Sequence, residues 1–321
     1  MKNEELYIYK IMRKLLFIIA VWLTTAAIYA QKKVTFAPQW GAQAQFAGYF
    51  VAKEKGFFKE EGLDVTIIYP TYSQSSHVLL TEGKCQFITT MLLDAMKIRD
   101  WGTDLVNILQ TSRHNGTVIV GHNGKNPAKM KGAKVGKWNA GFSLIAMIAN
   151  KKEQFDYNFI RFTNNVSLFL SGAIDATLAM SYNEYYLLKQ SNVQLDDNCV
   201  YRFADHGYDI PDDGLYTTRE YYDANKDTAV RFARASRKGW EWCHSHPDEA
   251  LEIVMDYVNR NKVSTNRVLQ KLMLKEVLRL QKDKTGKAPF KLYKEDVERA
   301  NRMLVECDYI DRQTHYNDLV R

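Results

Sequence analysis

The stretch that most constrains the fold of this chain runs from residue 39 to residue 67 and carries the pattern of a β-α-β unit. Residues 34–40, VTFAPQW, have β-branched and aromatic side chains typical of a strand and end at a turn. Apolar side chains then recur near helical spacing, at Phe46, Tyr49, Phe50 and Phe57. Glycines end this pattern, and residues 63–68 indicate a second strand. Because β-α-β units build parallel sheets, we expect a ligand beyond the carboxyl ends of the strands, where Trp40 lies.

This stretch also resembles the opening of periplasmic substrate-binding proteins for thiamine pyrimidine precursors. The residues that carry the resemblance are Tyr49, Gly56, Phe57, Phe58, Glu61, Gly62, Leu63 and Asp64. The phrase SGAIDATLA at residues 171–179 is similar to a strand entry of the same family. Wider relatives bind sulfonates, taurine, nitrate or riboflavin, and the fungal pyrimidine-phosphate synthases share the fold. The resemblance implies an α/β, two-lobed periplasmic binding protein fold of type II, with a mixed sheet flanked by helices in each lobe and a ligand cleft between the lobes.

The first 30 residues have the pattern of a secretory signal peptide. Lys10, Arg13 and Lys14 precede the apolar run 15–23, and small residues lead to Ala30, after which we expect cleavage. The alternative is an N-terminal anchor helix, and Met12 is a second candidate start. No cysteine follows the run, so the sequence does not support a lipid anchor. The prediction is export to the periplasm.

Length and charge bound the remaining possibilities. About 290 residues follow the predicted signal peptide, more than a typical single domain, so two lobes are expected. The formal charge is +7 for the whole chain, and acidic and basic residues are interspersed. No basic run with interleaved aromatic residues is present, which argues against a nucleic-acid surface. A mild positive balance suits an anionic or a neutral small ligand.

The order of predicted elements suggests that the chain leaves the first lobe and later returns to it. We assign residues 31–127 to the first lobe, with a crossing in the Asn-, Gly-, Lys- and Pro-rich segment 122–132. Residues 128–210 form the second lobe. Residues 211–321 return to the first lobe and end in helices that look structural.

The four cysteines indicate neither a disulfide framework nor a metal site. Cys85, Cys199, Cys243 and Cys307 are far apart and form no CxxC motif, so free buried thiols are expected. The run from Cys243 to His246 contains two histidines, but Pro247 follows at what we interpret as a helix start. We expect no bound metal and no cofactor.

Polar and aromatic residues just beyond predicted strand ends form the candidate ligand site. An α/β sheet presents its ligand crevice at these positions. The first lobe contributes Gln39, Trp40, Tyr72, Ser73, Gln74, Ser75, Thr89 and Thr90. The second lobe contributes Trp138, Asn139, Ser181, Tyr182, Asn183 and Glu184.

These residue types suit a flat heterocycle. The faces of Trp40 and Trp138 can stack on a ring, while Asn183 and Glu184 can bind ring nitrogens or an exocyclic amine. Each residue also has a structural interpretation: the tryptophans could pack between the lobes, and Ser75 or Ser76 could simply cap a helix.

The synthase chemistry of the fungal relatives is not expected here. Those enzymes use a lysine and a histidine four residues apart, and the resemblance places these positions at Thr90 and Asp94. A threonine cannot form a Schiff base, and an aspartate lacks the near-neutral pKa of histidine. Residues 205–214 also lack the cysteines of the synthases. We therefore expect a binding protein and no enzyme.

The combined prediction is a periplasmic solute-binding component of an ABC-type uptake system, present as a monomer. It would pass its ligand to an inner-membrane permease driven by a separate ATPase. The expected ligand is an aminopyrimidine related to thiamine biosynthesis. The alternatives are a sulfonate, nitrate or riboflavin-like ligand, and a ligand-sensing module for a membrane receptor.

Overall fold

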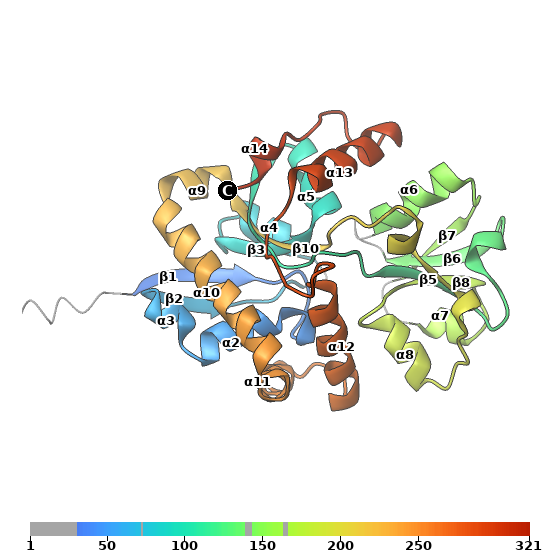
Figure 1. Cartoon of the computed structure of the whole chain (residues 1–321), viewed down its shortest axis with the longest axis horizontal. Coiled ribbons are helices and arrows are strands. Elements are labelled where there is room, and N and C mark those ends of the chain that lie inside the picture. Colours follow the sequence, from blue (N-terminus) through green and yellow to red (C-terminus); the bar gives the residue numbers. More distant parts are fainter. Residues whose placement is uncertain (1–30, 72, 139–142, 163–165) are drawn as a thin grey trace, which may run out of the picture.

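Two five-stranded sheets form two lobes in the computed structural model, which describes residues 31–71, 73–138, 143–162 and 166–321 (Figure 1). The sheet of lobe 1 has the order β2-β1-β3-β10-β4. Its strands are β2 (Leu63–Ile67), β1 (Lys32–Ala37), β3 (Phe87–Met91), β10 (Asp213–Thr218) and β4 (Leu105–Gln110). β1 is parallel to β2 and β3, whereas β10 is antiparallel to β3 and β4.

The sheet of lobe 2 repeats this arrangement. Its order is β7-β6-β8-β5-β9, with β7 (Asn158–Phe162), β6 (Lys134–Trp138), β8 (Ala176–Met180), β5 (Thr117–Gly121) and β9 (Val200–Arg202). β6 is parallel to β7 and β8, and β5 runs antiparallel between β8 and β9. Each lobe is thus a mixed sheet, as predicted.

The chain crosses between the lobes earlier than the sequence suggested. β5 pairs with β8 and β9, so the first crossing is residues 111–116, between β4 and β5. The predicted crossing at 122–132 is a turn within lobe 2 between β5 and β6, and it contains the short helix η2 (Pro127–Lys129). The boundary at residue 127 is therefore corrected to the end of β4. The return crossing, residues 207–212, leads into β10, close to the expected position.

The opening β-α-β unit is present and shows why its glycines matter. β1 and β2 pair in parallel with Lys32 opposite Leu63. Between them lie α2 (Ala47–Glu54) and α3 (Phe57–Glu60), separated by Gly56. Gly56 has a φ of 81°, a left-handed conformation that disfavours residues with a Cβ atom. The predicted single helix is therefore two short helices with a turn at this glycine.

The core of lobe 1 depends on the C-terminal half of the chain. α10 (Lys226–Ser245) packs across α2 so closely that a Cβ atom on Gly239 would lie 2.0 Å from the Gly48 carbonyl oxygen. Phe232 of α10 stacks on Phe87 with ring centroids 4.1 Å apart. Trp240 is buried against the backbone at Gly48. These contacts make α10 an integral part of the lobe that the first 110 residues begin.

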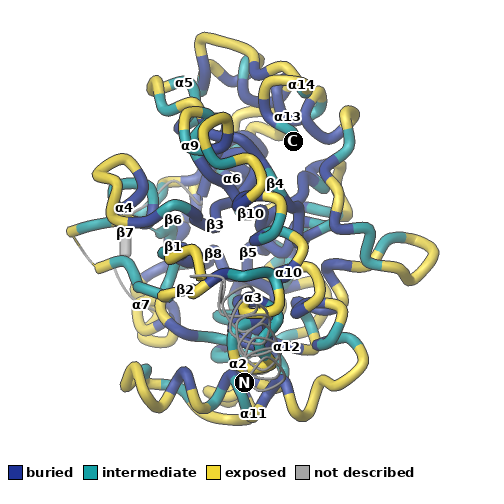
Figure 2. The backbone as a smooth tube through the Cα atoms, turned by 90° about the vertical axis from the view of Figure 1, so that its left-hand side faces the viewer, coloured by how far each residue is buried: buried dark blue, intermediate teal, exposed yellow. Residues whose placement is uncertain are grey.

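The remaining helices cover the two sheets, and the buried positions concentrate in the strands between them (Figure 2). Lobe 1 carries α4 (Ser76–Thr81), α5 (Leu92–Asp100), α9 (Arg219–Ala224), α11 (Pro247–Arg260), α12 (Arg267–Leu280), α13 (Lys294–Glu306) and α14 (Tyr316–Leu319). Lobe 2 carries α6 (Leu144–Glu153), α7 (Ser167–Leu170) and α8 (Glu184–Gln190). α11 begins at Pro247 with His246 as its N-cap, as predicted.

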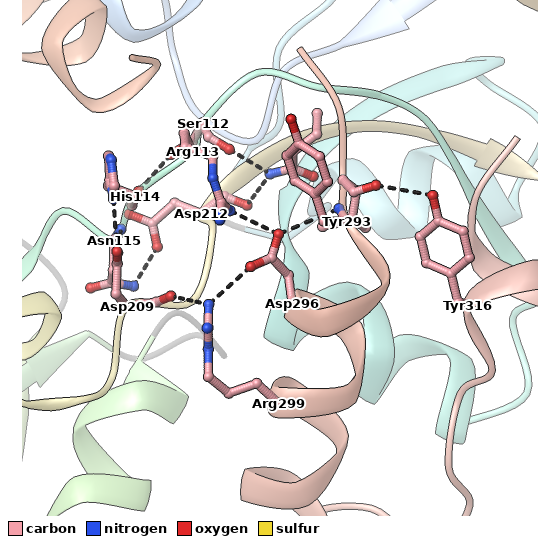
Figure 3. Close-up of polar contacts among 12 residues, drawn as sticks. Ser112, Arg113, His114, Asn115, Asp209, Asp212, Tyr293, Asp296, Arg299 and Tyr316 are labelled. Atoms are coloured by element: carbon pink, nitrogen blue, oxygen red, sulfur yellow. Dashed lines mark hydrogen bonds and ion pairs between the residues drawn. The ribbon is translucent and has the colours of Figure 1, made fainter. Parts of the chain in front are cut away.

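Carboxylates of the return crossing hold the outgoing crossing in place (Figure 3). Asp212 accepts hydrogen bonds from Asn115 Nδ2 at 2.7 Å and from the Gly116 amide at 2.6 Å. Asp209 pairs with His114 Nδ1 at 2.7 Å and accepts from the Asn115 amide. The two crossings are therefore hydrogen-bonded to each other and form one connection between the lobes.

The helix α13 contacts this connection from lobe 1. Asp296, buried in the first turn of α13, pairs with Arg113 at 2.8 Å and with Arg299 at 2.9 Å. Arg299 in turn donates to the carbonyl oxygen of Asp209 at 2.6 Å. The network in Figure 3 thus connects both crossings to a single helix.

No helix in the described part of the chain is long and apolar enough to span a bilayer, and no group of three metal-binding side chains is present there. All four cysteines are buried free thiols. The predicted signal peptide, residues 1–30, lies outside the described residues.

Candidate functional site

A cavity of about 430 Å³ lies between the lobes at the carboxyl ends of β1, β3, β6 and β8. Both lobes line it. Lobe 1 supplies Trp40, Gln43, Gln45, Met91, Val263, Ser264, Thr265, Leu269 and Gln270. Lobe 2 supplies Trp138, Met180, Tyr182, Asn183, Glu184 and Leu187. Its volume falls in the range of small-molecule sites.

A buried carboxylate anchors the lobe 1 wall. Asp213, the first residue of β10, accepts hydrogen bonds from Gln39 Nε2 and Gln45 Nε2, both at 2.7 Å. Burial raises the pKa of Asp213 to about 6, and the two amide donors oppose that shift by stabilising the charged form. The carboxylate therefore remains ionised near neutral pH while buried beneath the cavity.

Two more glutamines complete this wall. Gln43 donates to Gln45 Oε1 at 2.6 Å. Gln270, near the start of α12, accepts from the Ala44 amide at 2.7 Å and donates to Thr265 Oγ1 at 3.0 Å. These bonds fix the loop after β1 against α12, so the C-terminal half of the chain positions the first part of the site.

A second carboxylate organises the lobe 2 wall. Glu184, at the start of α8, accepts from the Met180 amide at 2.9 Å and from Trp138 Nε1 at 3.3 Å. Asn183 Nδ2 also donates to it at 3.3 Å. Burial raises the pKa of Glu184, and these hydrogen bonds oppose the shift. Glu184 thus orients Trp138 as well as contributing its own charge to the cavity.

The cavity walls combine aromatic faces with polar groups. Trp40 and Trp138 come from opposite lobes and are both half-buried. Tyr182 is buried beside them, and its hydroxyl has no hydrogen-bond partner within the described part of the chain. Burial raises the pKa of Tyr182 well above its usual value, so it stays protonated and can donate a hydrogen bond.

The charge of the lining is negative. None of the described residues that line the cavity is lysine, arginine or histidine, and Glu184 is the one carboxylate among them. Asp213 adds a second negative charge just below the surface. Such a site favours a neutral or positively charged ligand over a bare anion.

The residues predicted to bind ligand line the cavity, are buried outside its lining, lie in the turn before α4, or lie outside the described residues. Trp40, Trp138, Tyr182, Asn183 and Glu184 line the cavity. Gln39, Thr89, Thr90 and Ser181 are buried outside this lining: the Gln39 amide donates to Thr89 Oγ1, and Ser181 donates to Glu276 at 2.8 Å. Tyr72 and Asn139 lie outside the described residues.

The described residues of the turn before α4 do not line the cavity. Ser73, Gln74 and Ser75 are not among its lining residues. Ser75 instead caps α4 by accepting a hydrogen bond from the Val78 amide at 3.2 Å, and Gln74 donates to Glu82. The structural interpretation of Ser75 as a helix cap is therefore the one observed.

Two further segments that were not predicted to bind ligand also line the cavity. Gln43 and Gln45 lie three and five residues after Trp40, and two glutamines in the predicted loop after a strand were a usable signal. Residues 263–265 and the first turns of α12 also line the cavity, although the C-terminal helices looked structural. The spacing of apolar residues in α12 indicates a helix that packs on the core. That spacing does not indicate that the amino end of the helix lines a cavity.

The two positions that the resemblance assigns to the synthase lysine and histidine are not among the residues that line the cavity. Thr90 is buried within β3, and Asp94 is buried in the first turn of α5. Burial raises the pKa of Asp94 to about 7. Neither residue offers a nucleophilic amine to the cavity.

The family follows from a sequence match that covers more than half of the chain. Residues 43–250 match the family described as NMT1/THI5 like. The chain belongs to this family. The NMT1/THI5-like match includes most of the opening unit, all of lobe 2 and the start of α11, and so confirms the predicted resemblance.

Relatives of this NMT1/THI5-like chain include both binding proteins and enzymes. The chain is 26% identical over 227 residues to a formylaminopyrimidine-binding protein of Halalkalibacterium halodurans, covering 67% of this chain and 68% of that protein. It is 24% identical over 257 residues to a 4-amino-5-hydroxymethyl-2-methylpyrimidine phosphate synthase of Aspergillus parasiticus, covering 75% and 74%.

A solved structure shows the fold. The periplasmic aliphatic sulphonate binding protein SsuA of Escherichia coli is similar with a TM-score of 0.65 at 13% identity, covering 90% of this chain and 92% of that one. The NMT1/THI5-like chain therefore has the periplasmic binding protein fold, as predicted.

Proposed function

We propose that this protein is the solute-binding component of an ABC-type uptake system and that its ligand is a thiamine-related aminopyrimidine. The observation that carries the proposal is the cavity between the lobes. Its lining has a tryptophan from each lobe, amide and hydroxyl groups, and one carboxylate, Glu184. A flat ring can stack on the indoles, and an amino group can donate to the acceptors.

The electrostatics favour an amine over an anion. A sulfonate or nitrate would face Glu184 with no described cationic side chain in the lining to compensate. Removing an anion from water without such a partner is unfavourable. The sulfonate or nitrate alternative is therefore less well supported, although SsuA shares the fold.

Transport is better supported than synthesis. An enzymatic function has to be considered because a fungal relative of this chain is named as a pyrimidine phosphate synthase. Thr90 and Asp94 stand at the positions that the resemblance assigns to the synthase lysine and histidine, and neither lines the cavity. We expect no covalent pyridoxal phosphate, so an aldimine absorption band that borohydride removes with a mass shift would contradict this assignment.

The proposed setting is the periplasm, where the protein would act as a monomer and deliver its ligand to a permease with a separate ATPase. Solved structures with this fold include the ligand-binding component of an ABC-type import system. A sensing role remains the alternative. Intact mass of the exported protein should begin at Gln31, and a mature protein that retains residues 15–30 would favour an anchor.

Calorimetry provides the direct test of the ligand. Wild-type protein would be titrated with 4-amino-5-hydroxymethyl-2-methylpyrimidine, with an aliphatic sulfonate and with nitrate, and we expect binding of the pyrimidine alone. Trp40→Ala should weaken that binding about 5- to 150-fold, because base stacking on an aromatic side chain contributes roughly 1–3 kcal/mol. Binding of nitrate or sulfonate with no pyrimidine binding would overturn the proposed ligand.

A further inference from the structure

The buried carboxylate of Asp213 does not touch the cavity, yet it is connected to the cavity surface by two glutamine side chains. The chain of hydrogen bonds runs from Asp213 Oδ2 to Gln45 Nε2 at 2.7 Å, and from Gln45 Oε1 to Gln43 Nε2 at 2.6 Å. Gln43 is half-buried and lines the cavity.

The chemistry of the groups dictates how both amides are turned. An ionised carboxylate can only accept hydrogen bonds, so Gln45 must direct its NH₂ group toward Asp213. The Gln45 carbonyl oxygen then points to Gln43, and Gln43 must donate a hydrogen bond to it from its own NH₂ group. The Gln43 carbonyl oxygen has no partner in the described part of the chain and is left as an acceptor at the cavity wall.

We infer that Asp213 is a positioning residue that determines ligand specificity by holding Gln43 with its carbonyl oxygen available to the cavity. This inference rests on the proposed function and deepens it: the ligand should carry a hydrogen-bond donor, such as an exocyclic amine, where it meets Gln43. An oxo group at that place would face the Gln43 carbonyl oxygen, acceptor against acceptor.

The other side of Asp213 makes the arrangement sensitive to an isosteric change. Asp213 Oδ1 accepts from Gln39 Nε2, so each carboxylate oxygen receives one amide. The side chain in Asp213→Asn offers one acceptor and one donor, and one glutamine must therefore reverse. Reversal of Gln45 and Gln43 together keeps every bond of the chain. Reversal of Gln39 would instead pair its buried Oε1, which has no partner among the described residues, and leave its buried NH₂ group unpaired. Unpaired buried N–H donors are rarer in proteins than under-satisfied carbonyl oxygens, so reversal of Gln39 is the less favourable change. We expect the pair to reverse and to present a donor to the cavity.

Protonation of Asp213 should have the same consequence as this substitution. The pKa of Asp213 is raised to about 6 by burial. The titratable groups facing it are Tyr49 of α2, Tyr182 before α8 and Tyr216 of β10, which burial keeps protonated, and the adjacent Asp212. The pKa of Asp212 is also raised, so Asp213→Asn is needed to assign a titration to Asp213.

The first experiment needs no ligand. In ¹⁵N-labelled protein, the side-chain amide signals of Gln43 and Gln45, assigned with Gln43→Met and Gln45→Met, would be followed by NMR as the pH falls from about 8 to about 5. We expect both signals to shift with one common midpoint and to lose that transition in Asp213→Asn. If the chemical shift of the Gln43 amide does not change with pH while that of Gln45 does, the inferred coupling of Asp213 to Gln43 is wrong.

The second experiment measures the consequence for specificity. Dissociation constants would be determined for 4-amino-5-hydroxymethyl-2-methylpyrimidine and its 4-oxo analogue. Asp213→Asn should reduce the preference for the amino compound by about 10-fold or more, since leaving polar groups mispaired in a buried site has effects of this order. A purely structural role would weaken both compounds by the same factor, and that result contradicts the inference.

Gln45→Met supplies the matched control, because it breaks the chain of bonds but leaves Asp213 in place. It should lower the same preference, and adding Asp213→Asn to it should change the preference no further. If Asp213→Asn does not fold, Gln45→Met and Gln43→Met still test the inference. An unchanged preference for the amino compound in both variants would contradict it. If wild-type protein binds neither pyrimidine, the proposed ligand is wrong. The NMR titration then tests by itself whether Asp213 controls the orientation of Gln43.

Discussion

Each lobe organises its half of the cavity around one carboxylate, but the two lobes draw the partners of that carboxylate from different distances along the chain. In lobe 2, Glu184 accepts from Met180 and Asn183, which are near neighbours, and from Trp138. In lobe 1, Asp213 accepts from glutamines 168 and 174 residues earlier. The lobe 2 wall is largely local, whereas the lobe 1 wall exists only when both ends of the chain are folded together.

This difference extends to the cores beneath the walls. Gln45 lies in the short helix η1 (Ala44–Phe46), directly before α2, and α2 is packed against α10 through Gly48 and Gly239. The lobe 2 carboxylate sits at the start of the seven-residue helix α8. A substitution in the lobe 1 core should therefore lower both stability and ligand affinity. A substitution of Glu184 should lower mainly ligand affinity.

The largest expected effect tests the dependence of lobe 1 on its C-terminal core. Trp240→Ala should lower the free energy of unfolding by about 3–5 kcal/mol, because it removes a fully buried aromatic side chain and leaves a cavity. Urea denaturation followed by circular dichroism measures it. Trp101→Ala is the matched control, since Trp101 is 67% exposed and should change stability by no more than about 0.5 kcal/mol. Equal effects of the two substitutions would break the proposed difference between core and surface.

The second prediction contrasts Asp213 with a buried carboxylate that has no hydrogen-bond partner among the described residues. Asp94 has its pKa raised by burial from 3.8 to about 7. The folded state then binds a proton more tightly than the unfolded state, so wild-type stability should fall as the pH rises from about 4 to about 7.

Asp94→Asn removes this dependence. Its stability relative to wild type should be greater at about pH 8 than at about pH 4, by up to about 4 kcal/mol for a shift of roughly three pKa units. Urea denaturation at the two pH values checks this. A stability difference that is the same at both would show that Asp94 titrates normally.

The third prediction addresses the lobe 2 wall. Glu184→Gln replaces one carboxylate oxygen by an NH₂ group, which cannot accept from Trp138 or from the Met180 amide. Hydrogen bonds to charged groups contribute about 1.5–3 kcal/mol, so affinity for the pyrimidine should fall about 10- to 100-fold. Calorimetry measures it, with Glu220→Gln, an exposed glutamate in the first turn of α9, as the control. If Glu184→Gln binds the pyrimidine as tightly as Glu220→Gln does, the Glu184 carboxylate does not organise the lobe 2 wall in the way that Asp213 organises the lobe 1 wall.

The smallest effect concerns a residue that was predicted to bind ligand and was found to cap a helix. Ser75→Ala should lower the free energy of unfolding by about 1 kcal/mol through loss of the α4 cap. Affinity for the pyrimidine should be unchanged, because Ser75 does not line the cavity. Ser73→Ala, which removes no cap, is the control for stability. A loss of affinity in Ser75→Ala would restore the original assignment.

The sequence was sufficient for the parts of the fold whose contacts are local. The opening unit could be predicted because its strand, helix and strand lie within about 35 residues and obey period and turn rules. The crossing into lobe 2 was misplaced because residues 122–132 have the composition of a linker. The true crossing at 111–116 is short and is held by hydrogen bonds to Asp209 and Asp212, which no local pattern reveals.

The lining of the cavity was predictable only for residues at or just beyond a strand end. Trp40, Trp138 and Glu184, chosen by that rule, line the cavity. Ser73 and Gln74, chosen by the same rule, do not, because the rule carries no information on side-chain direction. Asp213 was missed because its importance depends on partners far away in sequence. Gln270 was missed because its helix was already explained by an apolar face.

The insertion of β10 between β3 and β4 has a consequence for the order in which the lobes can form. Lobe 2 takes its whole sheet from one continuous segment, β5 to β9, whereas lobe 1 lacks its fourth strand until residue 213 is available. A nascent or truncated chain that ends earlier would leave β3 and β4 with unpaired edges, which promote association between chains. Contacts that close long loops also form slowly. The lobe that begins the chain should therefore be the last to mature, and cleavage between β9 and β10 should damage lobe 1 more than lobe 2.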